Sequence, residues 1–281
     1  AVESFARDGL RGASMREIAS AARIRVSTLY HYFPSKEALY AEVQRQVQDQ
    51  MREQLAQLQR CVSTAKELMI KDVVLLGMGG SSLGPEVFRT TFGPQKGAPR
   101  LWVLDSTIPG WVRQVTKAVS PSRTLFLVAS KSGGTIEVMS LFAHFWKLVT
   151  KAKGNQGGKQ FVAITDPGTG LETMARDYGF SQIFSNPPDI GGRYSVLSLF
   201  GLVPAALLGV NIAKLLDRAA GMAERCRLST DIRTNPGAYL GAAMGSLAKA
   251  GCDKVTVIAS PSLATFGLWV EQLLAESTGK E

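Results

Sequence analysis

The stretch Val73-Val74-Leu75-Leu76-Gly77-Met78-Gly79-Gly80-Ser81-Ser82 gives the clearest indication of the architecture. Its four apolar residues predict a strand that is buried on both faces, and the loop rich in glycine and serine leads into a helical stretch. Three further apolar strands, each followed by a polar loop and a helix, are predicted at 101–104, 124–128 and 161–164. Because buried strands alternate with helices, we predict an α/β fold with a doubly wound parallel sheet.

Two loops at the carboxyl ends of these strands are suited to a phosphate group. Residues 77–82 precede a helix, so free backbone N–H groups and the helix dipole converge there. The loop Ser130-Lys131-Ser132-Gly133-Gly134-Thr135 offers three hydroxyls and a lysine at another helix start. Helix capping by Ser and Thr explains a single such loop, but two loops in one sheet favour a phosphate site.

The first loop also resembles a dinucleotide-binding loop, although two features argue against that reading. Ser82 occupies the last glycine position of the G-x-G-x-x-G fingerprint, and no acidic residue ends the next strand in the expected context. We therefore treat dinucleotide binding as a minor alternative and predict no cofactor.

The composition excludes several classes of protein. The chain has 281 residues, of which 45% are hydrophobic and 20% charged, enough for about two domains and unlike disordered, collagen-like or coiled-coil proteins. Three separated cysteines and two histidines argue against a disulfide scaffold and a metal site, and favour the cytoplasm. Glycines, a proline and an asparagine interrupt the uncharged run 194–213, so we expect a buried core element there and no membrane contact.

The net charge of +9 is not concentrated near the N-terminus. Residues 1–65 contain nine Lys and Arg against seven Asp and Glu, a net of +2, whereas residues 66–281 contain 23 against 16, a net of +7. A basic balance suits nucleic acid and anionic small molecules alike, so the charge does not choose between them.

Residues 1–47 are predicted to form short helices. The run Ser14-Met15-Arg16-Glu17 has the S-x-x-E form of a capping box, which predicts a helix from Met15. Residues 27–33 predict a second helix, and Ser35 is placed to cap a third that begins at Lys36. Two short helices joined by a tight turn form a helix-turn-helix layout, in which the second helix enters the major groove.

These residues resemble the DNA-binding domain of the TetR family of transcriptional regulators, most specifically in the run 28–39. The resemblance implies that four residues face the DNA backbone or groove: Thr28, Tyr30, His31 and Lys36. Arg23 stands where the family usually has the turn glycine, and a left-handed conformation there would cost about 1 kcal/mol. The alternative is a three-helix cap without a DNA partner.

A longer amphipathic helix is predicted next. Apolar side chains recur every three or four positions, at Val43, Val47, Met51, Leu55, Leu58 and Val62. We interpret 48–66 as a connector helix, with a dimerising seam as the alternative. Helical spacing from Val2 through Phe5 and Ala6, and an end soon after Gly279, lead us to interpret the chain as cut at both ends.

From about residue 66 to the end, the chain closely resembles glucose-6-phosphate isomerase, and most of all the isomerase half of the bifunctional transaldolase/glucose-6-phosphate isomerase proteins. Four motifs appear in the family's order, at 75–85, 129–137, 189–195 and 275–280. The resemblance implies a first sugar-isomerase (SIS) subdomain at 67–222 and the beginning of a second, truncated one at 223–281. Residues 255–258 would form the first strand of the second subdomain.

The resemblance also implies the roles of single residues. Isomerisation between aldose and ketose needs a carboxylate base and a cation near the developing oxyanion; Glu276 matches the family's base and Arg193 the arginine beside the enediolate. The phosphate would be held by Ser130, Ser132, Thr135 and the backbone around Lys131, and the sugar would be lined by Gly79, Gly80 and Ser81. Without the resemblance, a solvated Glu276 and an Arg193 paired with a nearby acid would be the simpler interpretation.

We therefore predict a protein of the glucose-6-phosphate isomerase type, which interconverts glucose 6-phosphate and fructose 6-phosphate through a cis-enediol. In the family, a histidine from a partner subunit and a lysine, both later in the sequence than the base, open the sugar ring, which implies a homodimer. Because five residues follow Glu276, we expect weak binding of sugar phosphate and poor turnover or none. The alternatives are a TetR-type DNA-binding regulator with a sugar-phosphate-sensing domain, and an artefactual joining of two unrelated genes.

Overall fold

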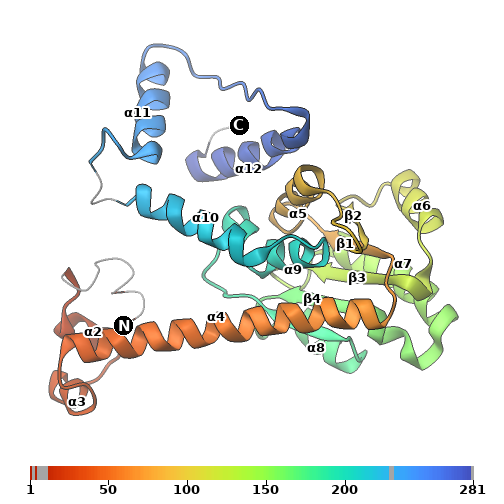
Figure 1. Cartoon of the computed structure of the whole chain (residues 1–281), viewed down its shortest axis with the longest axis horizontal. Helices are drawn as coiled ribbons and strands as arrows, with labels where there is room; N and C mark the ends of the chain where they lie inside the picture. Colours follow the sequence, from red (N-terminus) through yellow and green to blue (C-terminus); the bar gives the residue numbers. More distant parts are fainter. Residues whose placement is uncertain (2–3, 5–11, 228–230, 280–281) are drawn as a thin grey trace. The chain divides into compact units, whose positions relative to one another are not determined.

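The computed structural model describes residues 1, 4, 12–227 and 231–279, without the side chains of residues 44 and 46–52. The chain divides into two compact units, residues 1–60 and 61–281, each of which is described by itself (Figure 1). The helical start expected at Val2, Phe5 and Ala6 lies outside the described residues.

The first unit is built on α2 (Met15–Ala21), α3 (Val26–Tyr32) and the beginning of α4 (Lys36–Glu67). The helix starts expected at Met15 and Lys36 are confirmed, and the Ser35 hydroxyl accepts a hydrogen bond from the Ala38 N–H at 3.0 Å. The capping-box hydrogen bond expected from the Ser14 side chain is wrong, because only its carbonyl binds the helix, at Ile18 N. A small core joins the three helices: Ala13, Met15, Ile18, Ala19, Leu29, Leu39 and Val43.

The turn between α2 and α3 has the left-handed conformation that the missing glycine would favour. Arg23 has a φ of 54°. Its N–H donates to Ser20 O, and the N–H of Ile24 donates to Ala19 O, both at 3.0 Å. These two bonds form a Schellman motif, which ends α2 and directs the chain into α3. A non-glycine residue at this position therefore carries a conformational cost.

The second unit contains a five-stranded parallel sheet with the order β2-β1-β3-β4-β5. The strands are β1 (Asp72–Gly77), β2 (Arg100–Leu104), β3 (Thr124–Ala129), β4 (Phe161–Thr165) and β5 (Gln182–Ser185). The four strands expected from the sequence are confirmed. Strand β5 was missed because its polar ends interrupt the apolar run that marks the other strands.

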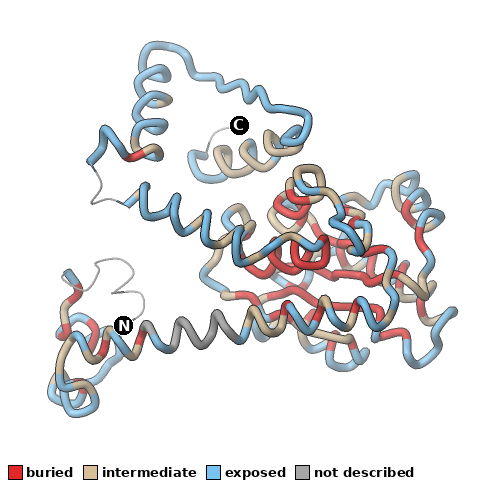
Figure 2. The backbone as a smooth tube through the Cα atoms, in the orientation of Figure 1, coloured by how far each residue is buried: buried red, intermediate tan, exposed pale blue. Residues whose placement is uncertain are grey.

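Helices cover both faces of this sheet. α6 (Pro109–Ala118), α7 (Ile136–Lys153) and α8 (Gly170–Asp177) share one apolar cluster with alternate residues of β1, β3 and β4. α5 (Gly80–Phe92) and α9 (Leu199–Leu207) contribute nothing to that cluster and pack against each other and against β1. Three short 3-10 helices complete this part: Pro121–Arg123, Gly154–Gln160 and Gly192–Leu197. The predicted α/β class, with a doubly wound parallel sheet, is confirmed. Strands β1, β3 and β4 are buried along their whole length, as Figure 2 shows, whereas β2 and β5 at the two edges are partly exposed.

The uncharged run 194–213 contains the expected buried core element, because every residue of α9 is buried, whereas Tyr194 and Leu197 before it are exposed. None of the described helices is both long enough and apolar enough to cross a membrane.

The last part of the chain has little core of its own. It contains α10 (Ile212–Arg225), α11 (Pro236–Lys249), a 3-10 helix at Pro261–Leu263 and α12 (Phe266–Thr278). Asn235 is the one buried residue among those described between 212 and 279. The strand expected at 255–258 is wrong: the segment is irregular, and the side chain of Ile258 is 94% exposed. No described strand pairs with it, so its backbone groups lack the ladder that would make it a strand.

Candidate functional site

An open cavity of about 400 Å³ lies at the carboxyl ends of β1, β3 and β4. The connection after β1 leads to β2 on one side of it, and the connection after β3 leads to β4 on the other. The loops after β1 and β3 therefore flank a topological switch point, where open α/β sheets bind ligands. The cavity is lined by Met78, Gly80, Ser81, Lys131, Ser132, Thr135, Asp166 and Gly192.

The glycine loop after β1 allows another segment to approach closely. Gly79 has a φ of 53°, a conformation that L side chains rarely adopt. A Cβ at position 80 would lie 2.3 Å from the carbonyl oxygen of Gly192. Because Gly80 has no side chain, Gly192 can pack directly against the loop, and Arg193 lies next to it.

The hydroxyl groups of the loop after β3 have different surroundings. Ser130 is buried, and its Oγ accepts a hydrogen bond from Gly133 N at 3.1 Å and lies 2.9 Å from Thr135 Oγ1. Ser132 is exposed and lines the cavity together with Thr135. Ser130 thus holds the shape of the loop through Gly133 and Thr135, while Ser132 and Thr135 are the hydroxyl residues that line the cavity.

The ammonium group of Lys131 is engaged by neighbouring loops. Its Nζ donates to a carboxylate oxygen of Asp166 and, at 2.8 Å, to the carbonyl oxygen of Pro188. Asp166 follows β4 directly. Lys131 therefore ties the loop after β3 to the segments that follow β4 and β5.

Arg193 and Glu276 come together from distant parts of the sequence. Arg193 lies in the 3-10 helix Gly192–Leu197 and Glu276 on α12, with Nη1 and Oε2 3.5 Å apart. Nε of Arg193 also donates to Ser277 Oγ at 2.9 Å. Gln272, one turn before Glu276, donates to its Oε1 at 2.8 Å and lies close to Gly79. The pair is thus attached to both the glycine loop and the Gly192 segment.

The environment of Arg193 favours its charged form. A hydrogen bond with Tyr194, and then the nearby charge of Glu276, raise the pKa of the guanidinium above its ordinary value. The guanidinium carbon lies 4.7 Å from the centroid of the Tyr194 ring. Hydrogen bonds from Ser277 and Arg193 lower the pKa of the Tyr194 hydroxyl. A fixed positive charge is what stabilisation of an oxyanion requires.

Most site residues expected from the sequence therefore lie in one region. Five of them line the cavity: Gly80, Ser81, Lys131, Ser132 and Thr135. Ser130 is buried in the loop after β3. The other three lie beside the cavity: Gly79 precedes Gly80 and is close to Gln272, Arg193 follows Gly192, and Glu276 is paired with Arg193. Sequence reasoning missed Gln272, Ser277 and Asp166. The spacing of Gln272 and Glu276, which places both on one face of a helix, was the available signal for the first.

An acidic residue does end the second strand, contrary to the expectation from the sequence, at the position where dinucleotide-binding proteins have one. Asp105 directly follows β2, and partial burial raises the pKa of its carboxyl group. The last glycine of the fingerprint is absent, however, because Ser82 stands there, buried, with its hydroxyl donating to Gly79 O at 3.0 Å. The loop therefore remains unlike the dinucleotide fingerprint.

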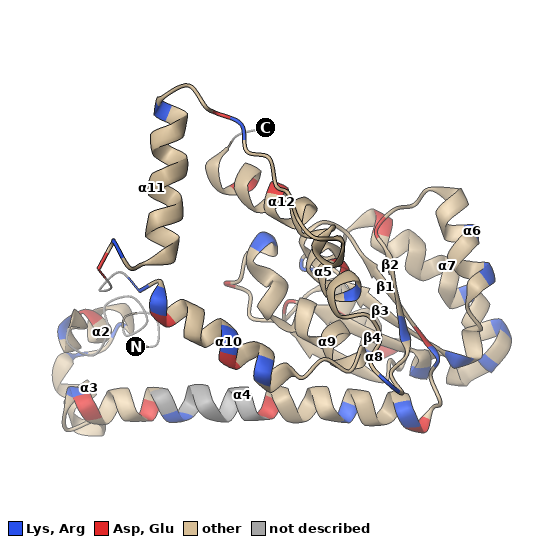
Figure 3. Ribbon diagram, turned by 45° about the horizontal axis from the view of Figure 1, so that its top comes forward, with Lys and Arg blue, Asp and Glu red and all other residues tan. Residues whose placement is uncertain are grey.

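In the first unit, the residues expected to face DNA lie on and near α3. Thr28, Tyr30 and His31 are exposed on this helix. Lys36 is partly buried, and its Nζ donates to the carbonyl oxygen of Ala13 at 3.2 Å. Figure 3 shows that Lys and Arg are distributed over both units and are not confined to the first, in line with the charge count.

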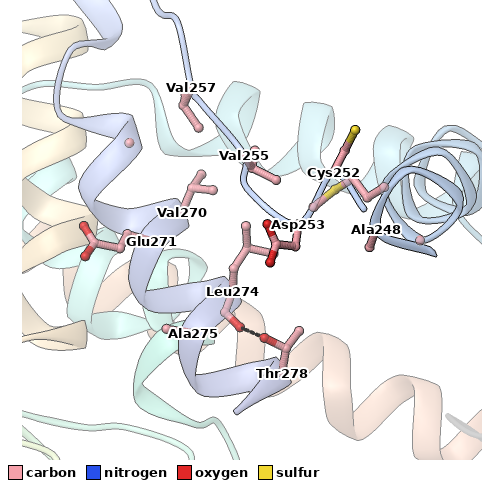
Figure 4. Close-up of a pocket in the computed structure, with 13 residues that line it drawn as sticks. Ala248, Cys252, Asp253, Val255, Val257, Val270, Glu271, Leu274, Ala275 and Thr278 are labelled. Carbon is pink, nitrogen blue, oxygen red and sulfur yellow. Dashed lines mark hydrogen bonds between the residues drawn. The ribbon is translucent and has the colours of Figure 1, made fainter. Parts of the chain in front are cut away.

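A second cavity, of about 580 Å³, lies between α11, α12 and residues 252–257 (Figure 4). Val255, Val257, Val270 and Leu274 make much of its lining apolar. The Thr278 hydroxyl donates to the carbonyl of Leu274 within its own helix. No group of His, Cys, Asp and Glu side chains that could hold a metal ion occurs among the described residues. The lining is therefore mostly apolar, with Cys252, Asp253 and Glu271 as its thiol and carboxylate residues.

Comparison with known families gives two matches. The model described as phosphoglucose isomerase matches residues 23–281, which begins well before the position near 66 that the sequence motifs indicated. The model described as bacterial regulatory proteins, tetR family, matches residues 1–43. The two matches overlap over α3 and the beginning of α4.

Individual relatives and solved structures agree with the longer match. The glucose-6-phosphate isomerase of Carboxydothermus hydrogenoformans is 33% identical over 239 residues, which cover 81% of this chain and 51% of that protein. That of Rubrobacter xylanophilus is 31% identical over 97% of this chain and 63% of its own length.

A hypothetical protein of Thermus thermophilus superposes with a TM-score of 0.72 at 28% identity, covering 81% of this chain and 54% of that one. The glucose-6-phosphate isomerase of Chlamydia trachomatis gives a TM-score of 0.70 at 25% identity, over 82% of this chain and 44% of that chain. The chain spans about half the length of the first curated relatives it matches.

Proposed function

Because this chain belongs to the phosphoglucose isomerase family, we propose that it interconverts glucose 6-phosphate and fructose 6-phosphate through a cis-enediol. One observation carries the proposal: Glu276 and Arg193, far apart in the sequence, meet beside the glycine loop after β1. A carboxylate base and a permanent cation are the two groups that the reaction needs.

In the proposed reaction, the Glu276 carboxylate removes the proton from C2 of the open-chain aldose. The electrons of that bond form the C1–C2 double bond, and the electrons of the C1 carbonyl move onto its oxygen. This oxygen takes the proton of the C2 hydroxyl and becomes a hydroxyl, which leaves the negative charge of the enediolate on the C2 oxygen. Glu276 then returns its proton to C1, which gives the ketose. Arg193 stabilises the negative charge that develops on oxygen, and Gln272 orients the Glu276 carboxylate through the 2.8 Å hydrogen bond.

We propose that the loop after β3 holds the phosphate group of the substrate. Ser132 and Thr135 line the cavity, and Ser130 and the backbone around Lys131 shape the loop. Gly79, Gly80 and Ser81 would lie along the sugar. Hydroxyl and N–H donors at a helix start suit a phosphate monoester.

A coupled assay of fructose 6-phosphate turnover tests the catalytic roles. Glu276→Gln removes the base and keeps the side-chain shape, so turnover should fall by about 10²–10⁴-fold. Glu271→Gln, an exposed position on the same helix, is the matched control and should keep the activity of the parent chain. Equal turnover in the two variants would contradict the assignment of Glu276.

A second function, binding of DNA by the first unit, is supported by the exposed face of α3. Thr28, Tyr30 and His31 are exposed there, after the left-handed turn at Arg23 that joins two short helices, and the second helix of a helix-turn-helix is the one that enters the major groove. We propose that these residues contact DNA, with Lys36 at the edge of the surface, in a regulator whose second unit senses sugar phosphate.

Fluorescence anisotropy with labelled duplex DNA tests this second function. Binding should weaken steeply as salt rises and should be reduced by the double variant Tyr30→Ala/His31→Ala. The control Tyr239→Ala changes an exposed tyrosine of the second unit and should bind as the parent chain does. A complex insensitive to salt, or equally strong in both variants, would argue against the proposal.

We also propose the division of the chain and its setting in the cell. Residues 1–47 would form the helix-turn-helix, 48–66 a connector, 67–222 the first SIS subdomain and 223–281 the beginning of the second. The boundary between the compact units, after residue 60 within the continuous helix α4, supports the connector. We propose a homodimer in the cytoplasm; the free thiols of Cys61, Cys226 and Cys252 suit a reducing compartment.

A further inference from the structure

The cavity at β1 and β3 contains an ion pair that the proposed chemistry does not use. Among the residues that line it, Lys131 is the one cation and Asp166 the one acid. The Lys131 ammonium donates to Oδ2 of Asp166 and, at 2.8 Å, to Pro188 O. The cavity wall therefore carries two opposite charges that compensate each other.

Asp166 is joined to Lys131 through its main chain as well as its side chain. Its N–H donates to the carbonyl oxygen of Lys131 at 3.4 Å, so the two residues are joined twice. Its side chain is 14% exposed, and Oδ1 is buried with no hydrogen-bond partner among the described residues. A carboxylate so shielded from water acts strongly on a nearby anion, because burial reduces screening.

We propose that Asp166 is a specificity-determining residue, which limits the affinity of this cavity for phosphate by neutralising Lys131. The inference rests on the sugar-phosphate function proposed above. With the ion pair intact, the cavity lining has no net charge, so a phosphate dianion is bound mainly by the hydroxyl and N–H donors of the loop after β3. Moderate affinity favours turnover, because binding substrate and product tightly and equally does not speed the chemical step.

Three variants separate the charge of Asp166 from its shape. Asp166→Asn keeps an oxygen acceptor for Lys131 and leaves the wall with one net positive charge, so fructose 6-phosphate should bind about tenfold more tightly, a change of about 1.4 kcal/mol. Lys131→Met leaves one net negative charge and should weaken binding by a similar factor. The double variant restores zero net charge and should return the affinity towards that of the parent chain.

Isothermal titration calorimetry with fructose 6-phosphate, at low and at high salt, measures these affinities. Asp166→Asn should show the steepest loss of affinity with salt, which a purely structural role would not produce. Fructose, which lacks the phosphate, should bind equally to all variants. Asp217→Asn, an exposed change of the same charge on α10, should bind as the parent chain does, and Asp166→Ser replaces Asp166→Asn if the amide disturbs folding.

The outcomes distinguish this inference from the function on which it rests. If the parent chain does not bind fructose 6-phosphate, the phosphate site itself is refuted, and the role of Asp166 with it. If the parent chain binds, but Asp166→Asn binds with equal or lower affinity or the double variant stays as weak as Lys131→Met, then the phosphate site stands and the role of Asp166 is overturned.

Discussion

Two segments of the second unit have similar sequences and opposite structures. Val73-Val74-Leu75-Leu76 forms the centre of β1, and none of these four residues is more than 1% exposed. Val255-Thr256-Val257-Ile258 is similarly apolar and richer in β-branched residues, yet it is irregular, and Val255 and Ile258 are 59% and 94% exposed. The first lies between β2 and β3, whereas no described strand pairs with the second. A strand-like sequence therefore becomes a strand only where neighbours supply hydrogen bonds and cover its faces.

The largest effect should come from removing a side chain at the centre of the sheet. Phe126 is fully buried, with its ring centroid 4.8 Å from that of Phe145 and 5.1 Å from that of Phe161. Phe126→Ala should lower the free energy of unfolding by about 3–5 kcal/mol, because it loses apolar burial and leaves a cavity.

Tryptophan fluorescence during urea unfolding measures this loss, because all four tryptophans lie in the second unit. The control is Leu268→Ala, at a side chain of α12 that is 53% exposed, where the cost should be much smaller. If both substitutions lowered the free energy of unfolding by similar amounts, the last part of the chain would be packed as tightly as the sheet, and the contrast between the two regions would be wrong.

A smaller but more local effect is expected where the glycine loop after β1 meets the 3-10 helix Gly192–Leu197. A Cβ at Gly80 would collide with the Gly192 carbonyl at 2.3 Å. Gly80→Ala should cost about 1–3 kcal/mol, and it should lower turnover, since Gly192 can no longer hold Arg193 next to the loop. Urea unfolding and the coupled assay measure the two consequences on the same preparation.

Gly110→Ala is the matched control for that substitution. A Cβ at Gly110, in the first turn of α6, meets nothing within 4 Å, so alanine there should stabilise the unit by about 0.5 kcal/mol. A Gly80→Ala variant as stable and active as Gly110→Ala would show that the Gly192 segment is not held where the structure places it.

The sequence predicted those features that depend on residues close together in the chain. The four long strands were recognisable because burial on both faces leaves an uninterrupted apolar run, and the loops after β1 and β3 because glycine and serine cluster there. β5 escaped because Gln182 and Ser185 border only two apolar residues. Residues 255–258 were assigned to a strand through the resemblance, which does not show whether partner strands are present in this chain.

The candidate site was predictable only in part, for a related reason. Gly79–Ser81 and the loop at 130–135 follow from local chemistry, whereas Glu276 and Arg193 were identified by resemblance alone. The Lys131–Asp166 ion pair joins loops after different strands, and the contact of Gln272 with Gly79 joins α12 to the glycine loop. Such pairs depend on the order of the strands and on helix packing, which no local pattern encodes.

A smaller effect is expected in the first unit, at Arg23, whose left-handed backbone conformation is unfavourable for a residue with a side chain. Arg23 adopts a φ of 54°, so Arg23→Gly should stabilise the first unit by about 0.5–1 kcal/mol, after allowing for the greater freedom of glycine in the unfolded chain. Hydrogen exchange of the α2 and α3 amides measures the change. Arg16→Gly, in the first turn of α2, should have the opposite sign, because glycine lowers the stability of a helix relative to other residues, by about 1 kcal/mol at most.

The smallest effect is expected at Ile258, and it is the one that bears most directly on the contrast between β1 and residues 255–258. Because its side chain is 94% exposed, Ile258→Ser removes almost no buried surface and should change the free energy of unfolding by less than about 0.5 kcal/mol. Ile164→Ser in β4, where the isoleucine is fully buried, makes the same chemical change and should destabilise strongly. If Ile258→Ser also cost more than about 1 kcal/mol, residues 255–258 would have to be covered in solution, and their lack of strand structure could no longer be explained by missing neighbours.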